Sequence, residues 1–214
     1  MPAEGPGLFT IGHSNQALDD FLDLLQQHRI EAVADVRTVP RSRYVPHFSA
    51  GPLREALAGR GIAYIPMGQE LGGRPQGEEF YDEEGHVLYG RLAAAPAFRD
   101  GIGRVLAEAQ TSRIALLCSE EDPSRCHRHL LIGQVLQARR VPVSHIRRDG
   151  HIETEAELAI READAHPPSG TGPQATLFDD SQASDEDQGS GDRSAQESHW
   201  RSPRPISRRK PPPS

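Results

Sequence analysis

The chain has 214 residues, of which 36% are hydrophobic, and it carries a formal net charge of −7. This length suits one domain with a full core, but the hydrophobic fraction is low for a chain that folds throughout, and the acidic balance argues against a protein that coats nucleic acid. Two cysteines are too few for a disulfide framework. Without a signal sequence or an apolar run of membrane-spanning length, we expect a cytoplasmic protein with no membrane partner.

Apolar runs alternate with amphipathic stretches up to residue 162, and this pattern predicts strands and helices in turn. The expected strands cover 8–12, 32–36, 62–66, 113–118 and 141–146. The expected helices cover about 15–25, 52–59, 96–109, 122–140 and 153–163, and a long insertion covers 67–95. Strands and helices at this spacing require crossover connections, so we predict one three-layer α/β domain with a mostly parallel sheet of about five strands.

The sequence changes character after residue 162. From Ala163 onward it is rich in Pro, Gly, Ser, Gln and Asp and has few large apolar residues. Such a composition cannot bury enough apolar surface to offset the entropy that is lost on ordering. We therefore expect the folded domain to cover 1–162 and a disordered tail to cover 163–214.

Polar side chains follow each of the expected strands. They lie at 12–15, 35–43, 68–74, 118–121 and 145–147. Because ligands of parallel sheets bind beyond the carboxyl ends of the strands, we predict a functional site at this edge. His13 is a candidate acid/base or phosphate contact, and Glu120 is a candidate general base. For either residue, a role in capping a turn or a helix is the alternative.

Three arginines follow the second expected strand. Arg37, Arg41 and Arg43 lie within seven residues, with no acid among them. A planar guanidinium group matches the geometry of phosphate and carboxylate anions. The spacing favours an anion-binding loop, and a solvated basic loop is the alternative.

Both cysteines lie in the stretch LLCSEEDPSRCHRHLL, which covers 116–131. Cys118 ends a strand, and Cys126 is expected in the first turn of the next helix, where amide dipoles and the neighbouring His127 and Arg128 favour a thiolate. A thiolate there can act as a nucleophile or a metal ligand, and the two thiols can also form a disulfide switch. An ordinary core position is the alternative for Cys118. Because the spacing is not that of a standard zinc site, we expect no bound metal.

Four motifs in this order resemble one family. They are T-I-G-H-S-N (10–15), D-V-R-T-V-P-R-S-R (35–43), L-G-G-R-P (71–75) and L-L-C-S-E-E-D-P-S-R-C-H-R (116–128). This set resembles the bacterial domain-of-unknown-function family numbered 488 (DUF488), over residues 8 to about 150. The resemblance implies that the signature positions are Gly12, His13, Ser14, Asp35, Arg37, Pro40, Ser42, Arg43, Cys118, Glu120, Cys126, His127 and Arg128.

From these observations we expect an enzyme, of hydrolase or transferase type, that acts on a phosphate-bearing substrate such as a nucleotide or nucleic acid without a cofactor. The candidate catalytic residues are Cys118, Glu120, Cys126, His13 and Asp35. The candidate anion-binding residues are Arg37, Arg41, Ser42, Arg43, Ser14, His127 and Arg128. Two alternatives are a non-catalytic module that is recruited to DNA, and a thiol redox or metal-binding protein.

The tail contains one short apolar pattern. Gln174, Leu177 and Phe178 fit Q-x-x-L-F, which is similar to the peptide by which bacterial repair and replication proteins bind the DNA sliding clamp. Leu and Phe side chains are suitable anchors for an apolar groove. We therefore expect a clamp-binding peptide at 174–178 and a link to DNA repair, with chance occurrence as the alternative.

Changing Leu177 and Phe178 to Ala is expected to abolish retention of the protein by an immobilised sliding clamp, because it removes both apolar anchors. A pull-down with the two purified proteins measures this retention. Equal retention before and after the change would rule out the clamp-binding peptide.

Overall fold

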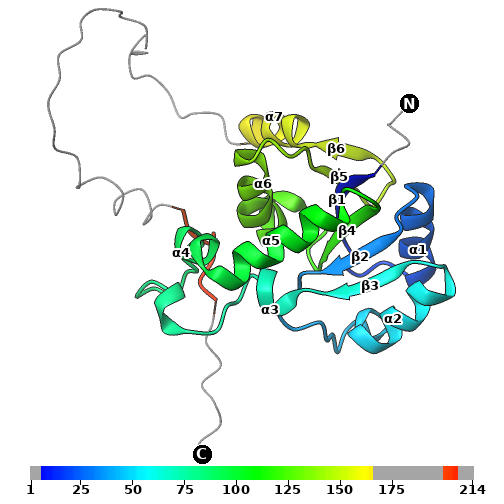
Figure 1. Cartoon of the computed structure of the whole chain (residues 1–214), viewed down its shortest axis with the longest axis horizontal. Coiled ribbons are helices and arrows are strands. Elements are labelled where there is room, and N and C mark those ends of the chain that lie inside the picture. The colour runs from blue at the N-terminus through cyan, green and yellow to red at the C-terminus, as the bar shows by residue number, and fades with distance from the viewer. Residues whose placement is uncertain (1–5, 166–199, 207–214) are drawn as a thin grey trace, which may run out of the picture.

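The computed structural model describes residues 6–165 and 200–206. Its centre is a six-stranded sheet with the order β3-β2-β4-β1-β5-β6 (Figure 1). The strands are β1 (Gly7–Gly12), β2 (Ala32–Asp35), β3 (Ala63–Pro66), β4 (Arg113–Cys118), β5 (Ser144–Ile146) and β6 (Ile152–Thr154). The first five are parallel and β6 is antiparallel to β5. The prediction of a mostly parallel α/β sheet is confirmed.

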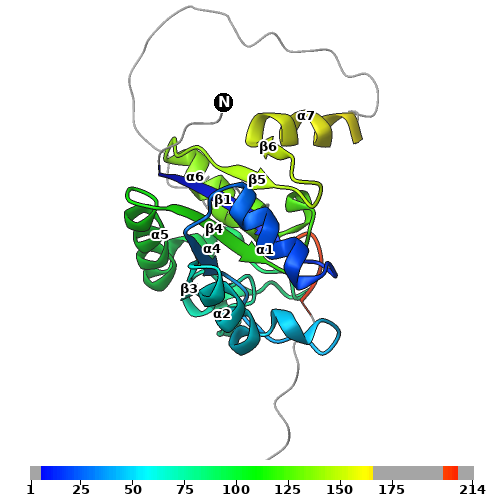
Figure 2. The ribbon, with the colours of Figure 1, turned by 90° about the vertical axis from the view of Figure 1, so that its right-hand side faces the viewer.

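Helices cover both faces of the sheet, and Figures 1 and 2 show the three layers. The helices are α1 (Leu18–Gln27), α2 (Ala50–Gly59), α3 (Gly68–Leu71), α4 (Tyr89–Ala94), α5 (Pro96–Glu108), α6 (Gln134–Ala138) and α7 (Glu155–Ala165). One hydrophobic cluster packs α1 and α2 on one face, called here the α1 face. A second cluster packs α4, α5 and α6 on the opposite face, called the α5 face.

The central strand shows why the sequence folds in this way. In β4, Ile114, Leu116 and Cys118 face the α5 cluster, whereas Ala115 and Leu117 face the α1 cluster. Side chains alternate between the two faces of a strand, so a run that is apolar at every position requires cover on both sides. This run therefore fixes β4 in the middle of the sheet and points the Cys118 sulfur toward the α5 face.

The sixth strand was not predicted from the sequence. Of the expected fifth strand at 141–146, only 144–146 pairs with neighbouring strands, as β5. The chain then turns at Gly150, whose φ of +82° suits glycine, and continues into β6. The three residues of β6 precede the Glu- and Ala-rich α7 directly. Because the helical pattern of α7 begins directly after β6, the sequence gives no separate signal for this short edge strand.

The segment after β4 differs from the single helix expected at 122–140. Asp122 accepts a hydrogen bond from the Ser124 amide, as a helix cap would, but only the 3-10 turn Pro123–Arg125 follows. Cys126 then has extended backbone (φ −125°, ψ 141°), and a π-helix over Arg128–Gly133 leads into α6. The expectation that Cys126 lies inside the first helical turn is therefore wrong. The extended residue instead lets its sulfur approach the end of β4.

Two parts of the segment expected to be a disordered tail have defined structure. Residues 163–165 complete α7, and 200–206, called here the C-terminal strap, lie along 85–89. The Trp200 indole donates to the Leu130 carbonyl (2.9 Å), and Trp200 and Ile206 pack against the α5 cluster. This apolar contact, between residues far apart in the sequence, is what the composition did not predict. Residues 166–199 and 207–214 lie outside the described ranges.

None of the helices in the described ranges combines the length and apolar character needed to cross a membrane.

Candidate functional site

The carboxyl ends of β1, β2 and β4 meet at one edge of the sheet. In the strand register Gly12 pairs with Cys118, and Asp35 pairs with Leu117. The residues that follow therefore form two polar clusters beside each other, one on each face. The α1-face cluster contains His13, Asp35 and Arg37, and the α5-face cluster contains Cys118, Cys126 and His127.

The α1-face cluster is buried and internally paired. Arg37 donates from Nε to Asp35 Oδ1 (2.8 Å) and from Nη2 to Asp35 Oδ2 (2.6 Å). Its Nη1 donates to the Phe48 carbonyl (2.8 Å) and lies 3.0 Å from His13 Nε2. The Arg37 side chain is only 4% exposed. Each guanidinium nitrogen thus has a partner inside the protein, which does not fit the expected role of Arg37 in binding a substrate anion.

His13 also has a partner at each ring nitrogen. Its Nδ1 donates to the Ser14 carbonyl (2.7 Å), its Nε2 accepts from Arg37, and the ring stacks on Phe48 at 4.4 Å. Burial lowers the pKa of His13 to about 4, and the charge of Arg37 acts in the same direction, so the ring is neutral at pH 7. Tyr64 donates to Asp35 Oδ2 (2.8 Å) and completes the cluster. In this arrangement His13 and Asp35 orient the loop after β2.

The α5-face cluster brings both thiols to one imidazole nitrogen. His127 Nδ1 lies 3.7 Å from Cys118 Sγ and 3.8 Å from Cys126 Sγ. Its Nε2 lies 3.2 Å from the Val36 carbonyl, which can only accept a hydrogen bond. Nε2 therefore carries the proton, and the lone pair of Nδ1 faces the two sulfurs.

The two thiols have opposite acidities. The hydrogen bond from Cys126 holds the pKa of the Cys118 thiol well below its usual range, and the charge of Arg128 acts in the same direction, against the effect of burial. Burial raises the pKa of the Cys126 thiol, and so does its hydrogen bond to Cys118. The pair thus favours a thiolate at Cys118 and a thiol at Cys126, whereas the sequence had pointed to Cys126 as the thiolate.

The same three side chains are able to hold a metal ion. Their ligand atoms, two sulfurs and one nitrogen, lie within 4.8 Å of one another. Two thiolates and an imidazole are typical zinc ligands, and a hydrogen bond from the second imidazole nitrogen to a carbonyl is the usual support for such a ligand.

Arg128 lies behind the thiols and is completely buried. Its Nε donates to Thr10 Oγ1 (3.1 Å), and its two Nη groups donate to the Glu120 and Glu121 carbonyls. The expected anion-binding role of Arg128 is therefore replaced by contacts with neutral oxygens of the loop after β4. Its charge remains close enough to lower the pKa of Cys118.

Several other candidate residues face solvent or form turns. Glu120 is exposed, and it contacts Arg128 only through its carbonyl. The Ser14 amide donates to the Ser119 carbonyl, and Ser42 Oγ accepts from the Val45 amide, so both serines bind backbone groups. Arg41 and Arg43 are exposed, as an anion-binding loop requires. The candidates Gln174, Leu177 and Phe178 lie outside the described residues.

The insertion at 67–95 covers the thiols. Leu71 and Tyr89 are buried in the same cluster as the two cysteines, and Gly73 packs directly against the His127 ring. A Cβ atom at Gly73 would lie 2.6 Å from His127 Cγ, so only glycine allows this contact. The C-terminal strap holds this cover, because the Tyr89 amide donates to the Trp200 carbonyl (2.9 Å). Cys118 is consequently only 7% exposed.

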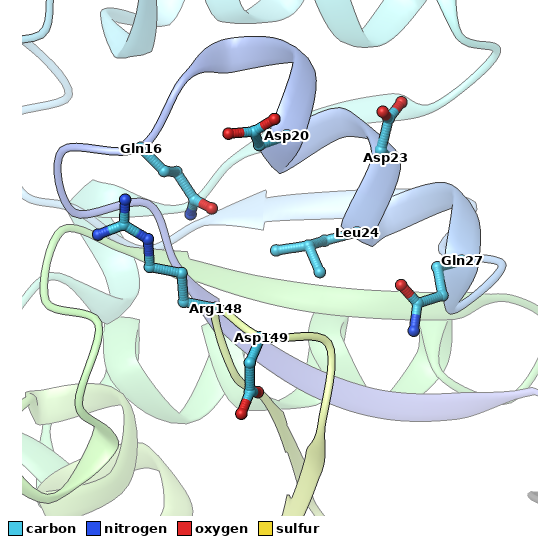
Figure 3. Close-up of a pocket in the computed structure, with 7 residues that line it drawn as sticks. All are labelled: Gln16, Asp20, Asp23, Leu24, Gln27, Arg148 and Asp149. Atoms are coloured by element: carbon cyan, nitrogen blue, oxygen red, sulfur yellow. The ribbon is translucent and has the colours of Figure 1, made fainter.

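A surface hollow of about 250 Å³ lies elsewhere, between α1 and the turn that follows β5. Figure 3 shows the residues that line it, Gln16, Asp20, Asp23, Leu24, Gln27, Arg148 and Asp149. None of the candidate residues from the sequence analysis lines this hollow, and the two thiols are not part of it.

Comparison with known families decides the family of this chain. A family model described as "Domain of unknown function DUF488" matches residues 17–135, which is more than half of the chain. This protein belongs to the DUF488 family. A search of curated proteins and a search of solved structures found no match.

The DUF488 match contains Asp35, Arg37, Cys118 and Cys126, whereas His13 precedes it and β5 follows it. The thiol cluster therefore lies within the matched region, although the sheet that supports it extends beyond the match.

Sequence reasoning missed a further polar cluster of this DUF488 protein, between β5 and α7. His145 Nε2 lies 3.1 Å from Glu155 Oε1, and His129 Nδ1 lies 3.0 Å from Glu155 Oε2. Although burial opposes it, the hydrogen bonds from the two histidines lower the pKa of Glu155 to about 2, so it is a carboxylate. The signal in the sequence was the second histidine of C-H-R-H, His129.

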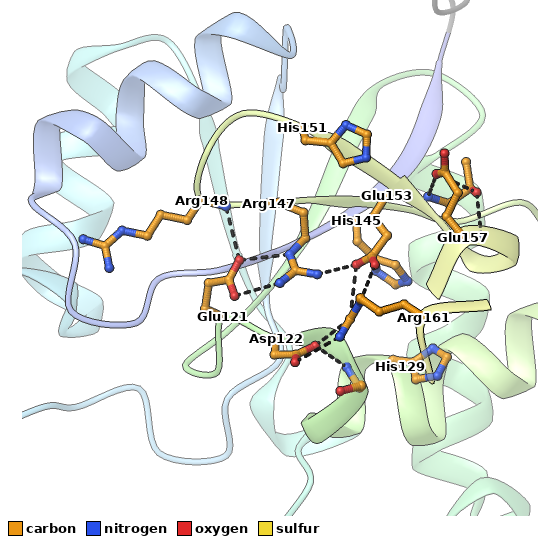
Figure 4. Close-up of polar contacts among 12 residues, drawn as sticks. Glu121, Asp122, His129, His145, Arg147, Arg148, His151, Glu153, Glu157 and Arg161 are labelled. Atoms are coloured by element: carbon orange, nitrogen blue, oxygen red, sulfur yellow. Dashed lines mark hydrogen bonds and ion pairs between the residues drawn. The ribbon is translucent and has the colours of Figure 1, made fainter. Parts of the chain in front are cut away.

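Charged side chains connect this region to the loop after β4, as Figure 4 shows. Arg147 binds Glu121 (2.9 Å) and also Glu153, and Arg161 binds Glu153 (2.7 Å) and Asp122 (2.8 Å). Although burial opposes it, the hydrogen bond from Arg161 lowers the pKa of Asp122 to about 2. The ladder of ion pairs thus fixes the loop between the two cysteines to β6 and α7.

Replacing Arg37 by Leu is expected to lower the free energy of unfolding by about 3–5 kcal/mol, because Asp35 is left as a buried charge without its partner. Urea titration followed by circular dichroism measures this loss. The exposed Arg41→Leu serves as the matched control and is expected to change stability by less than about 0.5 kcal/mol. Wild-type stability of the Arg37 variant would instead mean that this guanidinium group is free to bind a ligand.

Proposed function

We propose that this DUF488 protein carries out thiol–disulfide exchange, with Cys118 as the attacking thiolate, Cys126 as the second thiol and His127 as the base. One observation carries the proposal: both sulfurs lie within 3.8 Å of a single imidazole nitrogen whose lone pair faces them. A nucleophile, a base and a group that orients the base is the arrangement that activates a catalytic thiol. The Val36 carbonyl is the orienting group here.

The opposite pKa shifts of the two thiols support this division of roles. Exchange begins with a thiolate, which the low pKa of Cys118 supplies, and ends with a second thiol that is deprotonated only when it is needed. His127 Nδ1 is placed to accept that second proton from Cys126.

The reaction proceeds in two steps. The Cys118 thiolate attacks one sulfur of a substrate disulfide, forms a mixed disulfide and releases the other sulfur as a thiolate. Cys126 then gives its proton to His127 and attacks Cys118 Sγ, which forms the Cys118–Cys126 disulfide and releases the second substrate thiolate. Two electrons pass from the protein dithiol to the substrate. Since Cys118 is 7% exposed, a substrate reaches it only when the cover around Tyr89 moves.

A small aromatic disulfide is expected to form a lasting mixed disulfide with the Cys126→Ser variant, because no second thiol can resolve it. The wild-type protein is expected to end as the intramolecular disulfide. The Cys118→Ser variant is expected to react at least about 10-fold more slowly than Cys126→Ser, because the thiol that remains in it, Cys126, has the higher pKa. Intact-mass spectrometry of the proteins, with and without chelator treatment, measures the products and rates.

Two outcomes of this experiment would contradict exchange. Equal rates for the two single variants would remove the distinct roles of the thiols. A wild-type protein that reacts only after chelator treatment, and then at both cysteines alike, would identify Cys118, Cys126 and His127 as a metal site instead.

A second candidate function is binding of single-stranded nucleic acid, favoured by the exposed loop after β2. Tyr44 is 92% exposed and Val39 is 66% exposed, and the exposed Arg41 and Arg43 lie just before Tyr44 in the sequence. An exposed aromatic ring that follows two exposed arginines is suited to base stacking and phosphate binding. Such a substrate would agree with the phosphate-bearing substrate, the sliding-clamp partner and the link to DNA repair that the sequence suggests.

The position of this loop connects it to the thiol cluster. Thr38 Oγ1 accepts from the Arg74 amide (3.0 Å), and the neighbouring Gly73 contacts His127. Arg74 is itself exposed. A nucleic-acid strand bound along this loop would therefore pass near the insertion at 67–95 that covers the two cysteines.

Changing Tyr44 to Ala is expected to weaken binding of a fluorescent single-stranded oligonucleotide by about 1–3 kcal/mol, because one stacking contact is lost. Fluorescence anisotropy at fixed salt measures the dissociation constant, and Arg41→Ala with Arg43→Ala is expected to reduce its salt dependence. Arg99→Ala, an exposed arginine on α5, is the control. If the wild-type protein and the Tyr44 variant bind equally, the loop is not a nucleic-acid surface.

A further inference from the structure

We propose that His129, His145 and Glu155 form a binding site for a divalent transition-metal ion such as zinc, separate from the thiol cluster. The three residues come from three different elements: the π-helix Arg128–Gly133, β5 and the first position of α7. Their ligand atoms lie within 4.8 Å of one another. Two imidazoles and one carboxylate are a known ligand set for zinc that leaves one coordination position open.

The distances between the ligand atoms fit one ion at their centre. His145 Nε2 lies 3.1 Å from Glu155 Oε1, and His129 Nδ1 lies 3.2 Å from the same oxygen. Ligands at the usual zinc bond length of about 2.0–2.1 Å in a tetrahedron are about 3.3 Å apart. These two distances match that spacing, and the two histidine nitrogens lie within 4.8 Å of each other.

His145 has an outer hydrogen-bond partner, and a more distant carboxylate lies beside His129. His145 Nδ1 lies 2.8 Å from Thr10 Oγ1, which also accepts from Arg128 Nε. His129 Nε2 lies 3.7 Å from Glu162 Oε2. A ligating histidine commonly donates its other N–H group to an oxygen of this kind, which directs the remaining lone pair at the metal. His145 Nε2 is oriented toward Glu155 in this way.

The position of His129 between two carboxylates favours a metal ion. Its Nδ1 faces Glu155 and its Nε2 faces Glu162, and a carboxylate can only accept hydrogen bonds. A neutral imidazole has a single N–H group and cannot satisfy both sides, whereas an imidazolium or a metal-bound imidazole can. A metal ion on Nδ1 together with a proton on Nε2 satisfies both, and a divalent charge balances the two carboxylates.

Gly133 supplies the space beside the ligands. A Cβ atom there would lie 3.0 Å from Glu155 Oε1 and 3.5 Å from His129 Nδ1. The π-helix places Gly133 five residues after Arg128, and π-helical turns are frequent at functional sites. The ligands are mostly enclosed, since the side chains of His145, His129 and Glu155 are 0%, 6% and 16% exposed. Glu155, on α7, is the most open of the three.

The test uses the full-length Cys118→Ser/Cys126→Ser variant, in which the thiol cluster cannot bind metal. Titration with zinc chloride by calorimetry is expected to show one site and to raise the melting temperature. Glu155→Gln, which keeps the shape of the side chain, is expected to weaken zinc binding at least about 10-fold. Asp164→Asn, at an exposed position of the same helix, is the matched control and should bind as tightly as the parent.

A second measurement does not depend on the serine variant. Cobalt(II) added to the metal-free wild-type protein is expected to give visible d–d absorption, part of which is lost in Glu155→Gln. No zinc binding by the double serine variant, or equal metal binding with and without the Glu155 carboxylate in both measurements, would overturn the site. Because calorimetry is done without the cysteines, its result is independent of the proposed thiol–disulfide exchange.

Discussion

The structure depends on one buried cation, the guanidinium group of Arg128. It is completely buried, and the described residues that it hydrogen-bonds offer it neutral oxygens, from Thr10 and from the Glu120 and Glu121 carbonyls. Burying a charge costs several kcal/mol unless the surroundings compensate it. The surroundings are therefore organised around this group, and its charge adds to the hydrogen bond from Cys126 that lowers the pKa of the nearby Cys118 thiol.

This constraint explains the shape of the loop between the cysteines. The Glu120 carbonyl that Arg128 binds approaches β1 so closely that a Cβ atom at Gly12 would lie 1.8 Å from it. Only glycine at this position lets the loop reach the guanidinium group. The ion pairs of Glu121 and Asp122 with arginines fix the other side of the loop. The two sulfurs meet because both ends of this short segment are held.

Arg128 also connects the two proposed sites. Its Nε binds Thr10 Oγ1, which contacts His145, and its charge lowers the pKa of Cys118 on the other side. A thiol cluster and a histidine–carboxylate cluster thus share one guanidinium group through a single threonine. A change of charge in one cluster therefore alters the electrostatic potential at the other, because a short chain of hydrogen bonds in surroundings of low dielectric constant connects them.

Much of the fold could be predicted from local pattern. The run 113–118 is apolar at every position, and only a central covered strand accommodates it. The break at Cys126 could not be predicted, because Asp122 and Pro123 form a helix-start signal that only a single 3-10 turn follows. Docking of Trp200 and pairing of β6 depend on contacts distant in sequence.

The position of the polar residues at the sheet edge could be predicted from the sequence, but the roles of the individual residues there were harder to predict. The polar residues after β1, β2 and β4 meet at the carboxyl edge, where the sequence predicted a site. Whether Arg37 points inward or outward depends on Asp35, two residues earlier, which accepts two of its hydrogen bonds and was the available signal. His129 and Glu155 are 26 residues apart, so only the folded chain brings them together.

The most direct test of this account is the pKa of Cys118, measured by thiolate ultraviolet absorbance against pH in the chelator-treated protein. The account predicts one thiol that titrates well below the ordinary value of about 8.5. In Arg128→Gln that pKa should rise, whereas Arg128→Lys, which keeps the charge, should retain most of the shift. If the folded Arg128→Gln variant titrates like the wild-type protein, or if both wild-type thiols titrate at the ordinary value, the buried cation does not control the site.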